Sequence, residues 1–293
     1  MTDSAVLSAD DVAEGRNRRS RRRLLNLVID GVLLVFSLLM LLPLVFLVSN
    51  AFKTPAELLS WPPTIIPANP TVSNFSAVIA DTPLLVWIGN SLLFAILSAI
   101  AILITSAIAG YILAKFRYRT LTVVFMIILA TAIVPFEVYM IPLYLEAQSL
   151  KILNTTWGLL LGYLVMSFGI FLIRQNVAHS IPDELLEAAR IDGAGELWIF
   201  WRIVLPLLRG ALGALFVLAF FQAWTAFAWP IIVATKRESY TIEVGLALFQ
   251  TGFTVDLGRL SAASALVLIP SFTVFVLLRR NFVQGVASTG LKE

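Results

Sequence analysis

The sequence predicts an all-helical integral membrane protein with six transmembrane helices and both termini in the cytoplasm. Hydrophobic residues make up 59% of the chain and charged residues only 13%, whereas roughly a quarter of the residues in soluble domains are charged. Six apolar stretches are each close to the roughly 20 residues that a helix needs to cross the hydrocarbon core. Lysine and arginine are also shared unequally between the connections. The first two observations predict the class, and the third predicts the orientation.

The chain starts with a polar, basic tail, residues 1–23, which we expect to be disordered because it holds few apolar groups. Its arginines, followed by two leucines, resemble a twin-arginine export signal. The apolar run Leu24–Val48 is too long for a signal core, and no clear small-residue cleavage site follows it. We therefore predict an uncleaved first transmembrane helix over residues 24–49. A nucleic-acid-binding function is disfavoured, because no basic domain stands behind the tail.

Five further apolar runs predict the remaining spans, within a core domain of residues 87–280 that is followed by a cytoplasmic tail, residues 281–293. Their approximate bounds are Trp87–Ala114, Leu121–Leu145, Trp157–Val177, Gly210–Ala234 and Leu260–Leu278. With the N-terminus inside, all but five of the 21 Lys and Arg residues face the cytoplasm, as the positive-inside rule requires. The five outer ones are Lys53, Lys151, Lys236, Arg237 and Arg259. Trp87, Trp157 and Trp229 then lie at the outer boundary, where aromatic rings anchor helices.

Two outer connections have distinctive compositions. The extracytoplasmic segment of residues 50–86 is rich in proline, which excludes a long helix and favours an ordered, extended segment. The connection from Thr235 to about Gly258 carries aromatic and hydrogen-bonding residues suited to a polar ligand or a partner protein, although a plain connector has the same composition. The residues that we single out there are Gln250, Thr251, Phe253, Thr254 and Asp256.

The cytoplasmic loop of residues 178–209 is the most charged stretch of the second half of the chain. Pro182 at the start of a helix, with two acids behind it, predicts a short helix over Pro182–Ile191. Asp192, Gly193, Ala194 and Gly195 then break it, because glycine accepts the left-handed backbone of a helix end. A second helix is predicted over Glu196–Val204.

The second helix carries a cluster of aromatic side chains, Trp198, Phe200 and Trp201. Such a cluster is typical of the residues that dominate protein–protein interfaces. A helix lying in the membrane interface would have the same composition. The residues alone leave both interpretations open.

A family resemblance separates these interpretations. The loop resembles the EAA motif of membrane-spanning subunits of binding-protein-dependent ABC importers, through Glu187, Ala188, Ala189, Asp192, Gly193, Ile203, Leu205 and Pro206. Other pieces resemble the sugar branch related to the second permease subunit of maltose-type transporters: Phe52–Thr54, Asn90–Ser91, Pro135–Tyr144, and Phe282, Val283, Gly285, Gly290 and Lys292. That branch commonly has Trp, Asn and an acid in span five, whereas this chain has Trp224, Thr225 and Ala226.

The resemblance implies a type I ABC importer permease fold and a set of partners. These are a second permease, two ATPase subunits, alike or different, and an extracytoplasmic solute-binding protein that delivers a di- or oligosaccharide. ATP and Mg are expected in the ATPase subunits, and no cofactor is expected in this chain, which has no phosphate-binding GxxxxGK[ST] loop. The ATPase-coupling residues implied are Glu187, Ala188, Ala189, Asp192, Gly193, Glu196, Trp198, Phe200, Trp201, Leu205 and Pro206.

Polar and aromatic residues within the spans are candidates for a substrate path. They are Asn90, Ser91, Glu137, Tyr139, Gln222 and Trp224. Glu137 is the only carboxylate well inside the predicted span three, and acids in a membrane are costly and therefore often functional. Capping a kinked helix is the alternative for Glu137, and the partner permease carrying most sugar contacts is the alternative for the whole set.

Three other polar residues have plainer explanations. Asp30 is suited to pairing with a tail arginine, Arg174 to anchoring the topology, and His179 to the membrane interface. The chain has no cysteine and one histidine, which disfavours a metal site or a membrane-embedded enzyme. An ion-coupled transporter would be expected to bury several acids and to have inverted halves. A permease for an amino acid, phosphate, peptide or glycerophosphodiester would share the loop but not the sugar-branch pieces.

Overall fold

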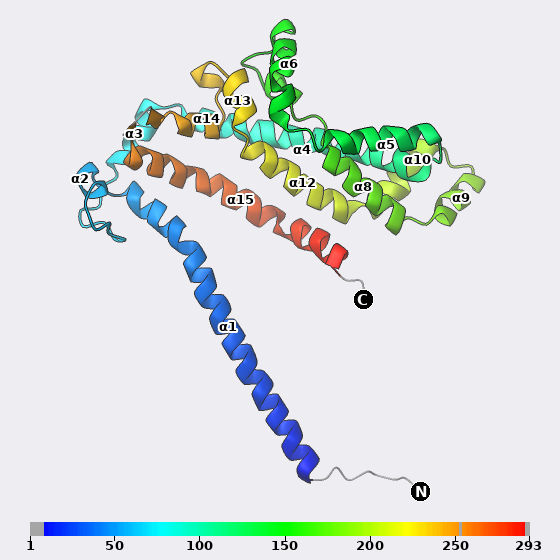
Figure 1. Ribbon diagram of the computed structural model, residues 1–293, viewed down its shortest axis with the longest axis horizontal. Coiled ribbons are helices and arrows are strands. Elements are labelled where there is room, and N and C mark those ends of the chain that lie inside the picture. The colour runs from blue at the N-terminus through cyan, green and yellow to red at the C-terminus, as the bar shows by residue number, and fades with distance from the viewer. Residues whose placement is uncertain (1–8, 252–253, 291–293) are drawn as a thin grey trace.

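The computed structural model describes residues 9–251 and 254–290, and its side chains are described over residues 25–250 and 255–277. Helices dominate the described residues. The strands among them are β1 (Gln250–Thr251) and β2 (Thr254–Val255), which pair antiparallel as a small hairpin. Figure 1 shows an elongated bundle from which α1 (Ala9–Ala51) diverges. The prediction of a mostly helical protein is confirmed.

The centre of the bundle is α4 (Leu84–Lys115), which packs along α8 (Ser167–Ser180) and α12 (Arg209–Trp224). Small residues permit this close approach. A Cβ at Gly110 of α4 would come within 2.8 Å of the Ile173 side chain of α8. The stretch predicted as the second span is one continuous helix, which runs the length of the bundle (Figure 1).

The first helix, α1, packs against α15 (Leu257–Gly290), and its most apolar part is exposed on all sides within this chain. It begins at Ala9, whereas we predicted disorder up to residue 23. The reason is that Arg, Ala and Leu are good helix formers and that a nucleated helix extends at one hydrogen bond per residue. Side chains of residues 9–24, including the six tail arginines that Asp30 was expected to meet, lie outside the described ones.

Three of the predicted spans are interrupted rather than straight. The third divides into α5 (Arg119–Thr131) and α6 (Phe136–Ser149), bent by 100° at Pro135, the extended N-cap of α6. The fourth divides into α7 (Thr156–Leu161) and α8, and the fifth into α12 and α13 (Ala228–Val233). Among the described residues, three helices are long and apolar enough to cross a membrane, and two bent pairs raise this number to five at most.

Short segments cover the end of α4 that begins at Leu84, which we call the α3–α14 end (Figure 1). They are α2 (Pro55–Leu58), α3 (Ser73–Asp81), η2 (Arg237–Ser239), α14 (Ile242–Ala247) and the hairpin. Buried Asn74 holds the segment after α1 by donating from Nδ2 to the carbonyls of Ala51 and Lys53, at 3.0 and 2.9 Å. The predicted absence of a long helix in residues 50–86 agrees with helices of four and nine residues.

Candidate functional site

The 178–209 loop forms the end of the bundle opposite the α3–α14 end (Figure 1). It consists of α9 (Asp183–Ile191), α10 (Glu196–Ile199), a π-helical turn η1 (Phe200–Val204) and α11 (Leu205–Leu207). Two helices separated by Asp192–Gly195 were predicted, and this prediction is confirmed.

The second helix of the loop is longer than predicted. It continues through Pro206 to Leu207 and then turns by 77° into α12. In the π turn, the Leu205 N–H donates to the Phe200 carbonyl, five residues back. Proline normally kinks or ends an α-helix because its ring meets the carbonyl four residues back. Here a π turn lies directly before Leu205 and Pro206, and the helix continues. Leu205 and Pro206 therefore lie within the helix, before the turn at Leu208, and do not end it.

Gly193 sets the turn between the two helices. Its φ is +84°, and no atom lies within 4 Å of a Cβ built on it. The backbone closes α9 through hydrogen bonds from Gly193 N to Arg190 O and from Ala194 N to Ala189 O, both 3.0 Å. The requirement for glycine is thus conformational, since only the backbone angle excludes other residues.

The loop is fastened to α4 at two points, and Glu196 makes the first. Its carboxylate accepts a hydrogen bond from the Tyr111 hydroxyl at 2.9 Å and pairs with Arg190 Nε at 2.7 Å. Tyr111 is 4% exposed, and its ring contacts Phe200 at a centroid distance of 5.6 Å. This one carboxylate therefore joins α4, α9 and α10.

Asp183 makes the second attachment, at the start of α9. One carboxylate oxygen accepts from Lys115 Nζ at 2.6 Å, and the other accepts from Arg117 Nη2 at 3.0 Å. Lys115 also donates to the Ile181 carbonyl, and its side chain is 6% exposed. The Lys115 hydrogen bond and charge, with Arg117 adding to them, hold the pKa of Asp183 below its usual value. Tyr111 and Lys115 are four residues apart on α4, so both attachments lie on one helical face.

The face of the loop turned away from the bundle is open. Glu187, Ala188 and Asp192 are exposed, Ala189 is half-buried, and Trp198 and Trp201 are 53% and 65% exposed. Phe200 is only 8% exposed and contacts Tyr111, so the expectation of an exposed cluster of three aromatic rings is wrong. Trp198 and Trp201 are three residues apart and share one face of the helix, whereas Phe200 lies two positions after Trp198 and falls on the other side. A hollow of about 550 Å³ between α9 and α10 is lined by Ala188, Ala189, Gly193, Trp198 and Ile203, among others.

Apart from the neighbours Asn90 and Ser91, the six residues predicted for a substrate path do not gather at one place. Among residues 25–250, no hydrogen bond or aromatic contact joins any two of them. Asn90 donates from Nδ2 to the carbonyls of Glu238 and Tyr240, at 2.8 and 3.0 Å. Ser91 accepts from Ile242 N at 2.8 Å. These two side chains hold the connection between α13 and α15 against α4, a structural contact that the sequence did not predict.

The other four lie apart from that contact. Glu137 is exposed in the first turn of α6, directly after the bend, and Tyr139 is 44% exposed beside the ring of Phe136. Gln222 is exposed on α12, whereas Trp224 is buried and stacks on Phe220. The position of Glu137 suits an acid at a helix N-terminus, which was the alternative explanation for it.

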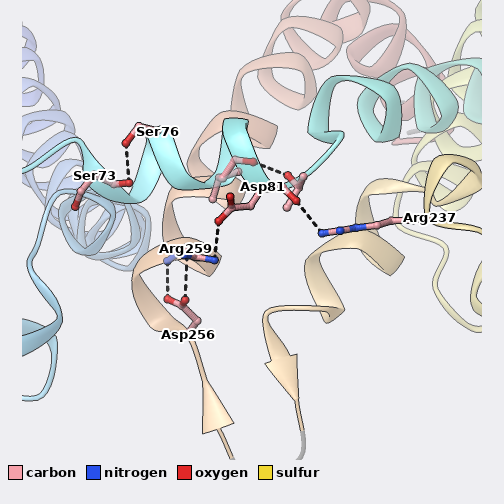
Figure 2. Close-up of polar contacts among 8 residues, drawn as sticks. Ser73, Ser76, Asp81, Arg237, Asp256 and Arg259 are labelled. Atoms are coloured by element: carbon pink, nitrogen blue, oxygen red, sulfur yellow. Dashed lines mark hydrogen bonds and ion pairs between the residues drawn. The ribbon is translucent and has the colours of Figure 1, made fainter.

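Figure 2 shows a network of polar contacts beside the hairpin. Asp256 Oδ1 accepts from the Arg259 N–H at 3.0 Å, as an N-cap does, and Arg259 Nη1 pairs with Asp81 of α3 at 3.1 Å. Arg237 Nη2 donates to the Asp81 carbonyl at 2.9 Å. Gln250 is exposed, the side chains of Thr251 and Thr254 lie outside the described ones, and so does Phe253 altogether. The network thus fixes the base of the hairpin to α3.

Arg174 and His179 were expected to anchor the topology and to lie at the membrane interface, respectively. Arg174 donates from Nε to the Leu113 carbonyl at 3.1 Å, and its guanidinium lies 4.0 Å from the Phe125 ring centroid. It therefore joins α8, α4 and α5, beyond the topological role that we expected. His179 is exposed at the end of α8.

Comparison with known proteins identifies a family and several relatives that this chain resembles. Residues 106–288 match the family described as "Binding-protein-dependent transport system inner membrane component". An arabinooligosaccharides transport system permease protein of Halalkalibacterium halodurans is 32% identical over 253 residues, which cover 85% of this chain and 90% of the relative. A lactose transport system permease protein of Rhizobium radiobacter is 31% identical over 266 residues, covering 90% and 96%.

Two further matches extend the comparison. An sn-glycerol-3-phosphate transport system permease protein of Yersinia pestis is 32% identical over 276 residues, covering 92% of this chain and 98% of the relative. A solved bacterial ABC transporter involved in the import of the acidic polysaccharide alginate has a chain that superposes with a TM-score of 0.74 at 23% identity. The superposition covers 95% of this chain and 100% of that one. It establishes a shared fold.

Proposed function

Because the chain belongs to the family of binding-protein-dependent transport system inner membrane components, we propose that it is one of two permeases forming the path of an ATP-driven importer for a di- or oligosaccharide. It is an inner-membrane protein and not the catalytic subunit of such a system, as in its relatives. The observation that carries the proposal is the 178–209 loop, which is fixed to the bundle on one side and open on the other.

The attachments of the loop support a lever mechanism. An ATPase subunit would bind the open face, with the two exposed tryptophans in a cleft of that subunit and Glu187 paired with a basic group there. Closure of the ATPase subunits on ATP would then pull the loop. Tyr111 and Lys115 would pass this displacement to α4, the helix around which the bundle is packed. Rocking of packed helices about a bound site is a known form of alternating access.

The membrane orientation follows from charge. Six spans with both termini in the cytoplasm would place the loop on the ATPase side and the α3–α14 end outside, in accordance with the positive-inside rule. The three long helices and the bent pair of α5 and α6 would supply four of these spans. The other bent pair joins the loop to α12, so α12 with α13 would supply the fifth. The interrupted pair α7 and α8 would supply the sixth, because irregular backbone is tolerated at membrane depth where protein covers it. The paired strands of the hairpin would then lie on the side of the solute-binding protein.

The further partners follow from the family. A second permease would complete the path, and two ATPase subunits, alike or different, would bind ATP and Mg. An external binding protein would deliver the sugar. The interrupted spans and the exposed face of α1 leave apolar surface for the second permease and for lipid.

The alternative solute is a glycerol phosphate or glycerophosphodiester, favoured by the 32% identity to the sn-glycerol-3-phosphate relative. Uptake by proteoliposomes that contain the chain, the second permease, the ATPase subunits and the loaded binding protein decides between them. We expect uptake of a labelled neutral oligosaccharide that requires ATP inside and that survives collapse of ion gradients. Uptake that follows an ion gradient without ATP would contradict the proposal, and uptake of glycerol phosphate alone would establish the alternative.

A further inference from the structure

A second hollow lies at the α3–α14 end, apart from the six residues that the sequence suggested for a path. Its volume is about 500 Å³, and it lies between the end of α1, the segment after α12, α14 and the start of α15. Its polar lining residues are Asn50, Glu243, Gln250, Ser261 and Ser264. Its apolar lining includes Phe46, Phe227, Leu246 and Ala247. The hollow therefore combines hydrogen-bonding groups with apolar walls.

Glu243 is the acid of this hollow. It is half-buried in α14, and among the described residues no hydrogen bond or ion pair to its carboxylate is found. Burial raises the pKa of Glu243 above its usual value. A half-buried carboxylate without a partner is costly. A ligand that brings hydroxyl donors to it would reduce that cost.

The groups around Glu243 complement it. Ser261 and Ser264 stand three residues apart on one face of α15 and offer hydroxyls that both donate and accept. The Asn50 carbonyl oxygen is already used by Lys53 Nζ at 2.8 Å, so its amide hydrogens are left to face a ligand acceptor. Phe227 is 43% exposed and provides a ring wall.

This pattern distinguishes between ligand classes. A divalent cation needs several oxygen ligands of high charge, and the described residues contain no group of three His, Cys, Asp or Glu side chains. A phosphate or a uronic acid would meet a carboxylate and no free cation among the lining residues. A neutral sugar presents hydroxyls of both polarities on its edge and C–H groups on its faces, which match the polar and the apolar lining.

We propose that this hollow is a subsite for a neutral sugar, in which Glu243 accepts hydrogen bonds from two hydroxyls and Phe227 packs against the ring. The proposal rests on the proposed function and narrows it, because it favours neutral sugars over anionic ones. It also places sugar contacts on this permease and not only on the second one.

The absence of cysteine from the chain gives a direct test. Ala247→Cys changes an apolar wall residue of the hollow that has no hydrogen-bonding role in the proposed subsite. It places a single thiol in the hollow of the full complex held in lipid nanodiscs. The rate at which a charged thiol reagent modifies this chain is measured by mass spectrometry, with and without a sugar. The neutral probes are lactose, maltotriose and arabinotriose, and the anionic probe is the disaccharide of galacturonic acid.

We expect at least one neutral probe to slow the modification, and the anionic probe to slow it less. Glu243→Gln should weaken the protection by about tenfold, the loss expected for one hydrogen bond to a charged group. Glu238→Gln changes an exposed acid in the same connection, outside the hollow, and should leave protection unchanged.

Three results would overturn the subsite. They are no protection by any neutral probe in a complex that imports a sugar, equal protection by the anionic probe, and protection that Glu243→Gln leaves unchanged. A complex in which Ala247→Cys is the only change, and which imports a sugar with ATP, shows that the variant is folded. If the unaltered complex imports no sugar, the proposed function itself fails, which is a separate result.

Discussion

Replacing Tyr111 by phenylalanine removes one hydroxyl and tests whether the loop moves α4. The Tyr111 ring is 4% exposed and packs against Phe200 and Phe116, at centroid distances of 5.6 and 6.0 Å. Phenylalanine keeps these contacts. The change therefore removes only the 2.9 Å hydrogen bond to Glu196, so its effect reports on this attachment and not on the packing.

The magnitude follows from the partner of that bond. A hydrogen bond to a charged group contributes roughly 1.5–3 kcal/mol. Glu196 keeps its Arg190 partner at 2.7 Å, and its side chain is 45% exposed, so solvent replaces part of the loss. We therefore expect Tyr111→Phe to weaken this attachment by about 1 kcal/mol of free energy. This corresponds to about a fivefold change in the equilibrium between the attached and the detached loop.

The assay measures sugar uptake and ATP hydrolysis side by side in proteoliposomes of the full complex. We expect Tyr111→Phe to lower the sugar imported per ATP hydrolysed by up to about fivefold, while the ATPase subunits still bind. Tyr118→Phe makes the same chemical change at a side chain that is 66% exposed, and should have no effect. An unchanged ratio of uptake to hydrolysis in Tyr111→Phe would refute the role of this attachment, and so would equal effects of the two variants.

Three further predictions concern the loop and the hairpin. Gly193→Ala places a side chain at φ +84° and should destabilise the turn by roughly 1–2 kcal/mol. We expect faster proteolysis of the loop in this variant and a smaller increase in Gly193→Asn. Equal proteolysis of the alanine variant and the unaltered chain would contradict this prediction. Asp183 has a lowered pKa in the folded protein, so its attachment is complete at neutral pH and is lost only as the pH falls below the ordinary Asp pKa toward the lowered one. Asp183→Asn should therefore give at neutral pH the protease-sensitive loop that the unaltered chain shows only in acid, and a resistant loop in this variant would count against the attachment. Asp256→Ala removes the N-cap of α15 and should cost about 1 kcal/mol of stability, measured as a lower melting temperature in detergent. The control Glu238→Gln should leave the melting temperature unchanged. An unchanged melting temperature in Asp256→Ala would show that Asp256 does not cap α15.

The sequence predicts well where local patterns determine structure. The bounds of α4 follow from a continuous apolar run, and α9 follows from Pro182 and the acids behind it. Gly193 was expected to end that helix, and its positive φ agrees. Each of these depends on neighbouring residues only.

Breaks inside apolar segments are not visible in the same way. Residues 162–166, between α7 and α8, are themselves largely apolar, so hydropathy continues across the interruption. The bend at Pro135 has a local signal, because proline restricts the residue before it, but an apolar run with a proline is also typical of a kinked single helix. Hydropathy indicates whether a segment suits an apolar environment, but not whether it forms one straight helix.

Contacts between distant segments were also missed. Tyr111 and Glu196 are 85 residues apart, as the hydrogen bond between them records, and no spacing rule connects them. Phe200 was expected beside the two tryptophans on the open face, yet it is two positions from Trp198, on the other side of the helix, and it contacts Tyr111. Glu243 stood in a connection full of polar residues, and only the packing of α14 shows that it is half-buried.

The account depends most on the claim that the open face of the 178–209 loop binds an ATPase subunit. A single thiol at Trp201, which is 65% exposed, tests this with a short thiol–amine cross-linker in membranes that contain the whole transporter. A thiol at Trp61, 89% exposed at the opposite end, is the matched control. The account predicts a cross-link to an ATPase subunit from Trp201→Cys and none from Trp61→Cys. No such product from Trp201→Cys, or the same product from Trp61→Cys, would contradict it.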